Sequence, residues 1–157
     1  GRVLVIDGSS SQPSEVFTPG LDIFSTTAKV NRSRCSFAST TLADGNVLVI
    51  GGSTLPILAE VYIGSAGRYD LVGLPKFNVS HQTLSALTSG EALVSGGLSG
   101  DEARPWAELY NPSTESFSVT GGMRYSRLFH TAILLEDGRV FVHGGCGGCS
   151  SEIYTSP

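Results

Sequence analysis

Residues 137–145 read Asp-Gly-Arg-Val-Phe-Val-His-Gly-Gly, and this stretch decides the fold. Its Asp-Gly pair is a turn signal between two apolar runs, and the second run ends at paired glycines. The same β-branched run ending in glycine occurs three more times along the chain. The last glycines are Gly8, Gly52, Gly97 and Gly145, which are 44, 45 and 48 residues apart.

Two further sequence features recur at the same spacing as these glycines. A Glu-apolar-aromatic triplet follows each run, and an aromatic residue follows each of the first three triplets. A short apolar or small-residue strand precedes the last three runs. The triplets are at 15–17, 60–62, 108–110 and 152–154, the aromatic residues are Phe24, Tyr69 and Phe117, and the preceding strands are 37–42, 82–87 and 130–135.

Each unit therefore reads as four short antiparallel strands, here named a, b, c and d in chain order. One such sheet cannot bury both of its faces alone, so four-stranded units that repeat every 40 to 50 residues are typical of a β-propeller. The sequence predicts one all-β domain over 1–157, with blades at about 1–30, 31–77, 78–123 and 124–157.

The two end blades are incomplete in this prediction. The first begins at strand b and lacks the inner strand a, and the last ends at strand c and lacks the outer strand d. Exposed strand edges attract further strands. We therefore expect this segment to belong to a larger propeller, or a second copy or another chain to complete the ring.

Composition narrows the classes of partner. The chain has 157 residues, of which 40% are hydrophobic and 15% charged, as expected for a folded domain. Its formal net charge of −4 argues against nucleic acid as a general partner. No apolar run approaches the roughly 18 residues of a membrane span.

The glycine pairs, the aromatic residue after them and the run 137–142 together resemble the kelch motif. The step from His130-Thr131-Ala132 into Asp137-Gly138 is similar to the galactose-oxidase-like branch of that family. The resemblance implies a kelch-type propeller. Because kelch propellers serve many purposes, the fold does not assign a function.

Alternating strand direction places the b–c loops and the d–a connections on one face of such a disc. These loops are long and varied (9–14, 53–58, 98–106 and 146–151), and variable loops on a rigid scaffold are where binding usually resides. We therefore predict a module that binds a protein or a glycan on this face. The candidate binding residues are Arg34, Lys76, His81, Arg104, Trp106, Arg124, Tyr125 and Arg127.

The same residues have a structural alternative. The arginines could brace neighbouring blades through backbone carbonyls, and Trp106 could pack over its own blade. For the recurring glutamates Glu15, Glu60, Glu108 and Glu152, four recurrences at one place favour a structural role. No catalytic residue is assigned.

The resemblance to galactose and glyoxal oxidases implies an enzymatic alternative, a copper radical oxidase completed by residues outside this chain. Cys35 is similar to the cysteine that those enzymes cross-link to tyrosine, and Phe129-His130 resembles their Tyr-His ligand pair. Phe129, however, has no phenol to ligate copper. Copper is therefore a cofactor only under this alternative, with Cys35 and His130 as its candidate ligands, and no cofactor is expected otherwise.

Cys146 and Cys149 have C-x-x-C spacing, but zinc normally needs four ligands and no second such pair exists in the sequence. A disulfide that closes this glycine-rich loop is the favoured interpretation. It predicts an oxidising compartment, and hence an extracellular or cell-surface protein.

Overall fold

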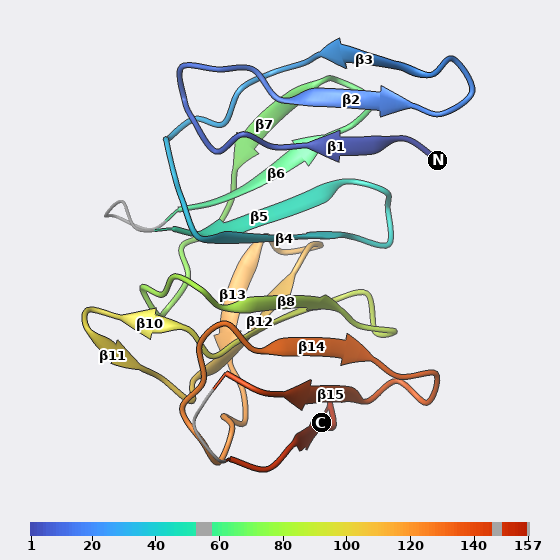
Figure 1. The fold of residues 1–157 in the computed structure, drawn as a ribbon. Coiled ribbons are helices and arrows are strands. Elements are labelled where there is room, and N and C mark those ends of the chain that lie inside the picture. The colour runs from blue at the N-terminus through green and yellow to red at the C-terminus, as the bar shows by residue number, and fades with distance from the viewer. Residues whose placement is uncertain (53–57, 146–148, 157) are drawn as a thin grey trace.

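The computed structural model describes residues 1–52, 58–145 and 149–156, and this part of the chain is all-β, with antiparallel sheets and no helix. Four of its sheets follow one another in chain order as a stack (Figure 1). Within these ranges, no helix is long and apolar enough to cross a membrane.

The strands of each sheet fall inside one of the four predicted units. Sheet 1 contains β1 (Val3–Val5), β2 (Glu15–Thr18) and β3 (Ile23–Thr26). Sheet 2 contains β4 (Phe37–Thr41), β5 (Val47–Gly51), β6 (Ala59–Ile63) and β7 (Arg68–Leu71). Sheet 3 contains β8 (Thr83–Ala86), β9 (Ala92–Ser95), β12 (Ala107–Asn111) and β13 (Ser116–Val119). Sheet 4 contains β14 (Thr131–Leu134), β15 (Val140–His143) and β16 (Glu152–Tyr154).

One stretch that was predicted as a loop is partly ordered into strands. Between β9 and β12, β10 (Leu98–Ser99) and β11 (Glu102–Ala103) form a small antiparallel ribbon. The turn between them contains Gly100, which adopts a positive φ of 62°. This ribbon projects from the stack on the side opposite the β8–β9 and β14–β15 hairpins (Figure 1).

The aromatic anchors of the repeat are cross-strand pairs. Phe17 lies opposite Phe24, Tyr62 opposite Tyr69, and Tyr110 opposite Phe117. Their ring centroids are 4.8, 5.0 and 5.0 Å apart. Tilted aromatic pairs at this spacing stabilise a sheet beyond the area that they bury. The repeat therefore places the same aromatic contact in sheets 1, 2 and 3.

Apolar contacts between successive sheets form the core. Val49 packs in a cluster with Val30 and residues of sheet 1, Val94 with residues of sheet 2, and Val142 with residues of sheet 3. These three valines are at most 2% exposed, whereas Val5, at the same register position in sheet 1, is 43% exposed. Full burial of such a side chain is worth roughly 1.5–3 kcal/mol. The outer face of sheet 1 lacks this contribution.

Glycines at the ends of β5 and β9, Gly51 and Gly96, let the next sheet approach closely. Gly96, with φ of 63°, follows β9, and a Cβ there would lie 2.7 Å from Cε1 of His130 and 2.8 Å from the carbonyl oxygen of Arg127. His130 belongs to the segment that enters β14 of the next sheet. The glycine thus provides both a left-handed backbone and the space that His130 occupies.

We expect Gly96→Ala to destabilise the fold by about 1–3 kcal/mol more than Gly100→Ala, because only Gly96 is crowded. The two glycines have nearly equal φ values of 63° and 62°, and a Cβ at Gly100 would meet nothing within 4 Å. The cost of placing alanine at a positive φ is therefore the same in both variants. Urea unfolding of both variants measures the difference, and equal midpoints would contradict this account of the sheet contact.

Candidate functional site

The long connections lie along one side of the stack, here called the loop side. It contains the described b–c connections, including 9–14 and 96–106, and the connections between sheets at 27–36, 72–82 and 120–130. The tight hairpins 42–46, 87–91 and 135–139 lie along the opposite side, here called the hairpin side (Figure 1). The alternation of strand direction predicts this separation.

Three of the recurring glutamates fasten the connections between sheets. Glu60 accepts the backbone N–H of Asn31 at 2.8 Å, Glu108 accepts that of Lys76 at 2.6 Å, and Glu152 accepts that of Arg124 at 2.5 Å. These three donors are equivalent positions of the repeat. Each carboxylate holds the segment that leads into its own sheet, so these glutamates have a structural role.

The carboxyl groups of Glu108 and Glu152 differ in the direction of their pKa shift. Burial raises the pKa of Glu108, although the N–H groups of Lys76 and Phe77 act in the opposite direction. Desolvation is also the largest single influence on Glu152. There, however, the N–H groups of Arg124 and Tyr125 and the Arg127 guanidinium together outweigh it, and the pKa is lowered.

Arg34 and Arg127, both predicted as binding residues, are buried at equivalent positions of the repeat. The Arg34 guanidinium pairs with Glu60 and donates to the carbonyl oxygen of Leu58 at 2.8 Å. Arg127 pairs with Glu152 at 3.0 Å and donates to the carbonyl oxygen of Gly144 at 2.6 Å. Both are braces inside the molecule, and they form no part of an accessible ligand surface.

Two of the predicted binding residues, Arg104 and Trp106, are in contact on the loop side. The Trp106 ring stacks on Phe77, with centroids 4.4 Å apart, and the Arg104 guanidinium carbon lies 4.9 Å from its centroid. Arg104 also pairs with Glu102 at 2.7 Å, and its side chain is 34% exposed. We name Phe77, Glu102, Arg104 and Trp106 the Trp106 cluster. The Trp106 ring thus packs against the connection between sheets 2 and 3.

The remaining predicted residues lie on the loop side in two groups. Arg124 is exposed, and its guanidinium carbon is 5.4 Å from the centroid of the Tyr125 ring; Lys76 is exposed at the equivalent position of the preceding connection. His81 packs its ring edge-on against Phe129, with centroids 4.3 Å apart.

Two aromatic residues of this side, Phe77 and Phe129, were not predicted as binding residues. Phe77 occupies the repeat position of Tyr125, and Phe129 that of His81. Aligning the connections with one another would have found them. Ser36, His81 and Phe129, which are equivalent, all adopt φ near 60°, and the N–H of His81 donates to Ser36 O at 3.0 Å and that of Phe129 to His81 O at 3.3 Å.

The residues of the copper alternative do not fit a copper site. His130 is buried, and its Nε2 lies 2.9 Å from the Thr83 hydroxyl and 3.4 Å from that of Ser95. Burial, and secondarily the charge of Arg127, lowers the pKa of His130 to about 4. Cys35 is exposed on a different connection, and across the described ranges no three His, Cys, Asp or Glu side chains gather as metal ligands.

The predicted disulfide falls partly outside the described residues. Cys149 is disulfide-bonded, whereas Cys146 lies outside the described part of the chain.

Comparison with known proteins adds no identification. No protein-family model matches the chain, and no curated protein matches it.

We expect Glu60→Gln to destabilise the protein by about 3–5 kcal/mol, because it leaves the buried Arg34 charge without its carboxylate. Glu15→Gln is the matched control: Glu15 has the same repeat position but is exposed in sheet 1. Its effect should stay within about 0.5 kcal/mol. Chemical unfolding of both variants measures the two changes in stability. A small effect of Glu60→Gln would show that the Glu60–Arg34 pair does not stabilise the fold.

His130 should make the stability depend on pH. Its folded pKa of about 4 lies below the ordinary 6.5, so its contribution is complete above pH 6.5 and declines as the pH falls toward 4. The decline is at most about 1.4 kcal/mol per pH unit. His130→Gln introduces the residue that sheet 3 has at the equivalent Gln82, and it should remove this component. Unfolding curves of both proteins between pH 4 and 7 test it; parallel pH profiles would contradict the prediction.

Proposed function

We propose that residues 1–157 are part of a kelch-type β-propeller that binds a protein partner through the Trp106 cluster on its loop side. The four successive sheets and their glycine-terminated b strands support the kelch assignment. The functional part of the proposal rests on one observation, the partly exposed Arg104–Trp106–Phe77 stack beside the projecting β10–β11 ribbon.

The chemistry of the cluster favours a protein partner. Tryptophan and arginine dominate the energetics of protein interfaces, since they combine large apolar area with directed polar contacts. A sugar ring stacks on an uncovered aromatic face. The Trp106 ring already contacts the Phe77 ring at 4.4 Å and the Arg104 guanidinium at 4.9 Å, which disfavours a glycan.

The cluster is also held in place by backbone hydrogen bonds. Arg104 N–H donates to Gly97 O, Gly96 N–H to Trp106 O and Met123 N–H to Pro105 O, each at 2.8 Å. A segment bonded on both sides loses little conformational freedom on binding, and this preorganisation favours affinity.

The proposed setting is extracellular or at the cell surface, supported by the disulfide bond of Cys149. The exposed apolar residues Val5 on sheet 1 and Ile153 on sheet 4, 43% and 45% exposed, support assembly with further sheets of this kind. Such assembly would leave the loop side accessible.

We expect Trp106→Ala and Arg104→Ala each to weaken partner binding at least about 30-fold, the roughly 2 kcal/mol that defines a hot spot. Arg139→Ala is the matched control, because Arg139 is likewise paired, with Asp137 at 2.6 Å, but lies on the hairpin side. Binding is measured with the immobilised chain against fractionated extracellular proteins and, in parallel, a glycan array.

A partner retained by wild type and Arg139→Ala but lost by both cluster variants supports the proposal. Glycan binding with no protein bound, or protein binding that is insensitive to both cluster variants while their far-UV spectra remain native, would overturn it.

A further inference from the structure

Two asparagines occur in Asn-x-Ser triplets, the acceptor pattern for N-linked glycans. The triplets are Asn31-Arg32-Ser33 and Asn78-Val79-Ser80. Both lie in connections between sheets on the loop side, and both asparagines are exposed. The triplet pattern alone does not distinguish them. A glycan is bulky and stays at the surface of a folded protein, so the surroundings of each side-chain amide decide which asparagine can carry one.

The repeat places the two triplets at positions that differ by two residues. Asn31 is equivalent to Lys76, whose backbone N–H donates to the Glu108 carboxylate at 2.6 Å. Glu108 also accepts the N–H of Phe77 at 2.9 Å. Asn31 therefore lies at the position that a glutamate fastens, whereas Asn78 follows the fastened residues.

The side-chain amide of Asn31 is engaged on both of its hydrogens. Its Nδ2 donates to the Glu60 carboxylate at 2.7 Å and to the carbonyl oxygen of Tyr69 at 3.2 Å. Glu60 is buried, and an asparagine amide nitrogen has only two hydrogens to donate. The N-glycosidic bond replaces one of these hydrogens with a sugar ring. A sugar on Asn31 would therefore displace one of the two acceptors and break a hydrogen bond that holds this connection to sheet 2.

Asn78 has different surroundings. It is exposed, and its side chain makes no hydrogen bond within the described ranges. The two residues after it are anchored: Val79 and Ser80 are 4% and 8% exposed, and the Ser80 N–H donates to Leu98 O at 3.0 Å. The backbone is therefore held in place beside a side chain that faces solvent. A sugar on Asn78 would break no hydrogen bond of the described structure.

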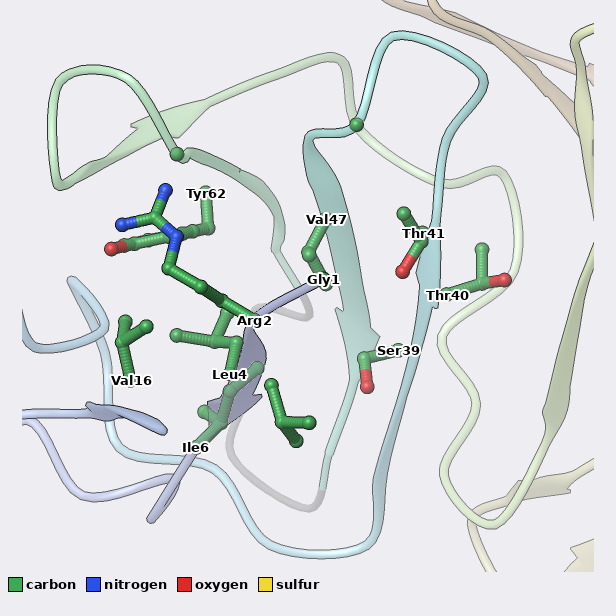
Figure 2. Close-up of a pocket in the computed structure, with 13 residues that line it drawn as sticks. Gly1, Arg2, Leu4, Ile6, Val16, Ser39, Thr40, Thr41, Val47 and Tyr62 are labelled. Carbon is green, nitrogen blue, oxygen red and sulfur yellow. The ribbon is translucent and has the colours of Figure 1, made fainter. Parts of the chain in front are cut away.

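The groove between sheet 1 and β4 does not enter this comparison. It has a volume of about 690 Å³, and residues such as Leu4, Val47 and Tyr62 line it (Figure 2). Among the described residues, neither triplet lines the groove. The space available to a glycan at either asparagine is therefore decided by the connection that carries it.

We propose that Asn78 is an N-linked glycosylation site and that Asn31, which has the same triplet, is not. The inference rests on the extracellular setting proposed above and is independent of the binding partner. Asn78 directly follows Phe77, so its glycan would flank the Trp106 cluster.

The modification is a group transfer from a lipid-linked oligosaccharide. Nδ2 of Asn78 forms a bond to C1 of the first sugar, and the bond between that carbon and the lipid diphosphate breaks. The diphosphate leaves with the electron pair of the broken bond, and the proton that Nδ2 loses passes to solvent. No oxidant or reductant takes part.

The test is expression of residues 1–157 behind a cleavable secretion signal in cultured eukaryotic cells, followed by mass spectrometry of the secreted protein. An amidase that releases N-linked glycans converts each modified asparagine to aspartate and so marks the site. We expect this conversion at Asn78 in most molecules and not at Asn31. Because the signal is supplied, the measurement does not depend on the extracellular setting proposed above.

Two variants separate the triplets. Asn78→Gln removes the proposed acceptor at an exposed position, and we expect complete loss of glycan from the secreted protein. Ser33→Ala is the matched control, because it removes the other triplet at an exposed serine and leaves Asn31 bonded to Glu60. The glycan should remain in this variant.

Three results would each overturn the proposal: secreted protein with a native far-UV spectrum and a glycan on Asn31, secreted protein without a glycan on Asn78, or a glycan retained in Asn78→Gln. None of these measurements involves the partner. The glycosylation site can therefore fail while partner binding by the Trp106 cluster holds, and the reverse result is equally distinguishable.

Discussion

The structure depends on apolar contact between the faces of successive sheets. Each sheet is only three or four short strands wide, and a sheet of this size is marginal in water unless a face is covered. The b-strand valines Val49, Val94 and Val142 are buried because the preceding sheet lies against them, and Val5 is exposed because none does in residues 1–157. Stability therefore grows with the number of sheet contacts, as in other repeat architectures.

Close approach of the sheets requires two local devices. Glycine at the end of a b strand leaves space for the side chain that enters the next sheet, as Gly96 does for His130. A glutamate on each of the last three c strands then fixes the connection that carries the chain across. These hydrogen bonds fix the connections between sheets on the loop side, where the partly exposed Trp106 cluster lies.

The same repeat explains which first strands have neighbours on both sides. Inside the stack, β8 adjoins both β4 and β14, the first strands of its neighbouring sheets. At sheet 1, β1 is an edge strand, and its residues Val3 and Val5 are 53% and 43% exposed.

The sequence by itself determined the four units, the order of their strands and the three-stranded sheets at both ends of the stack. This information is local: turn residues, alternating apolar runs and paired glycines recur at a fixed spacing. The tertiary structure alone decided which arginine side chains remain accessible at the surface. Arg34 and Arg127 are buried in ion pairs with Glu60 and Glu152, whereas Arg104 stays partly exposed beside Trp106. Each of those buried pairs joins residues about 25 positions apart, which meet only when a connection folds back over its own sheet. A contact of this kind cannot be predicted from the pattern of residue types along the sequence.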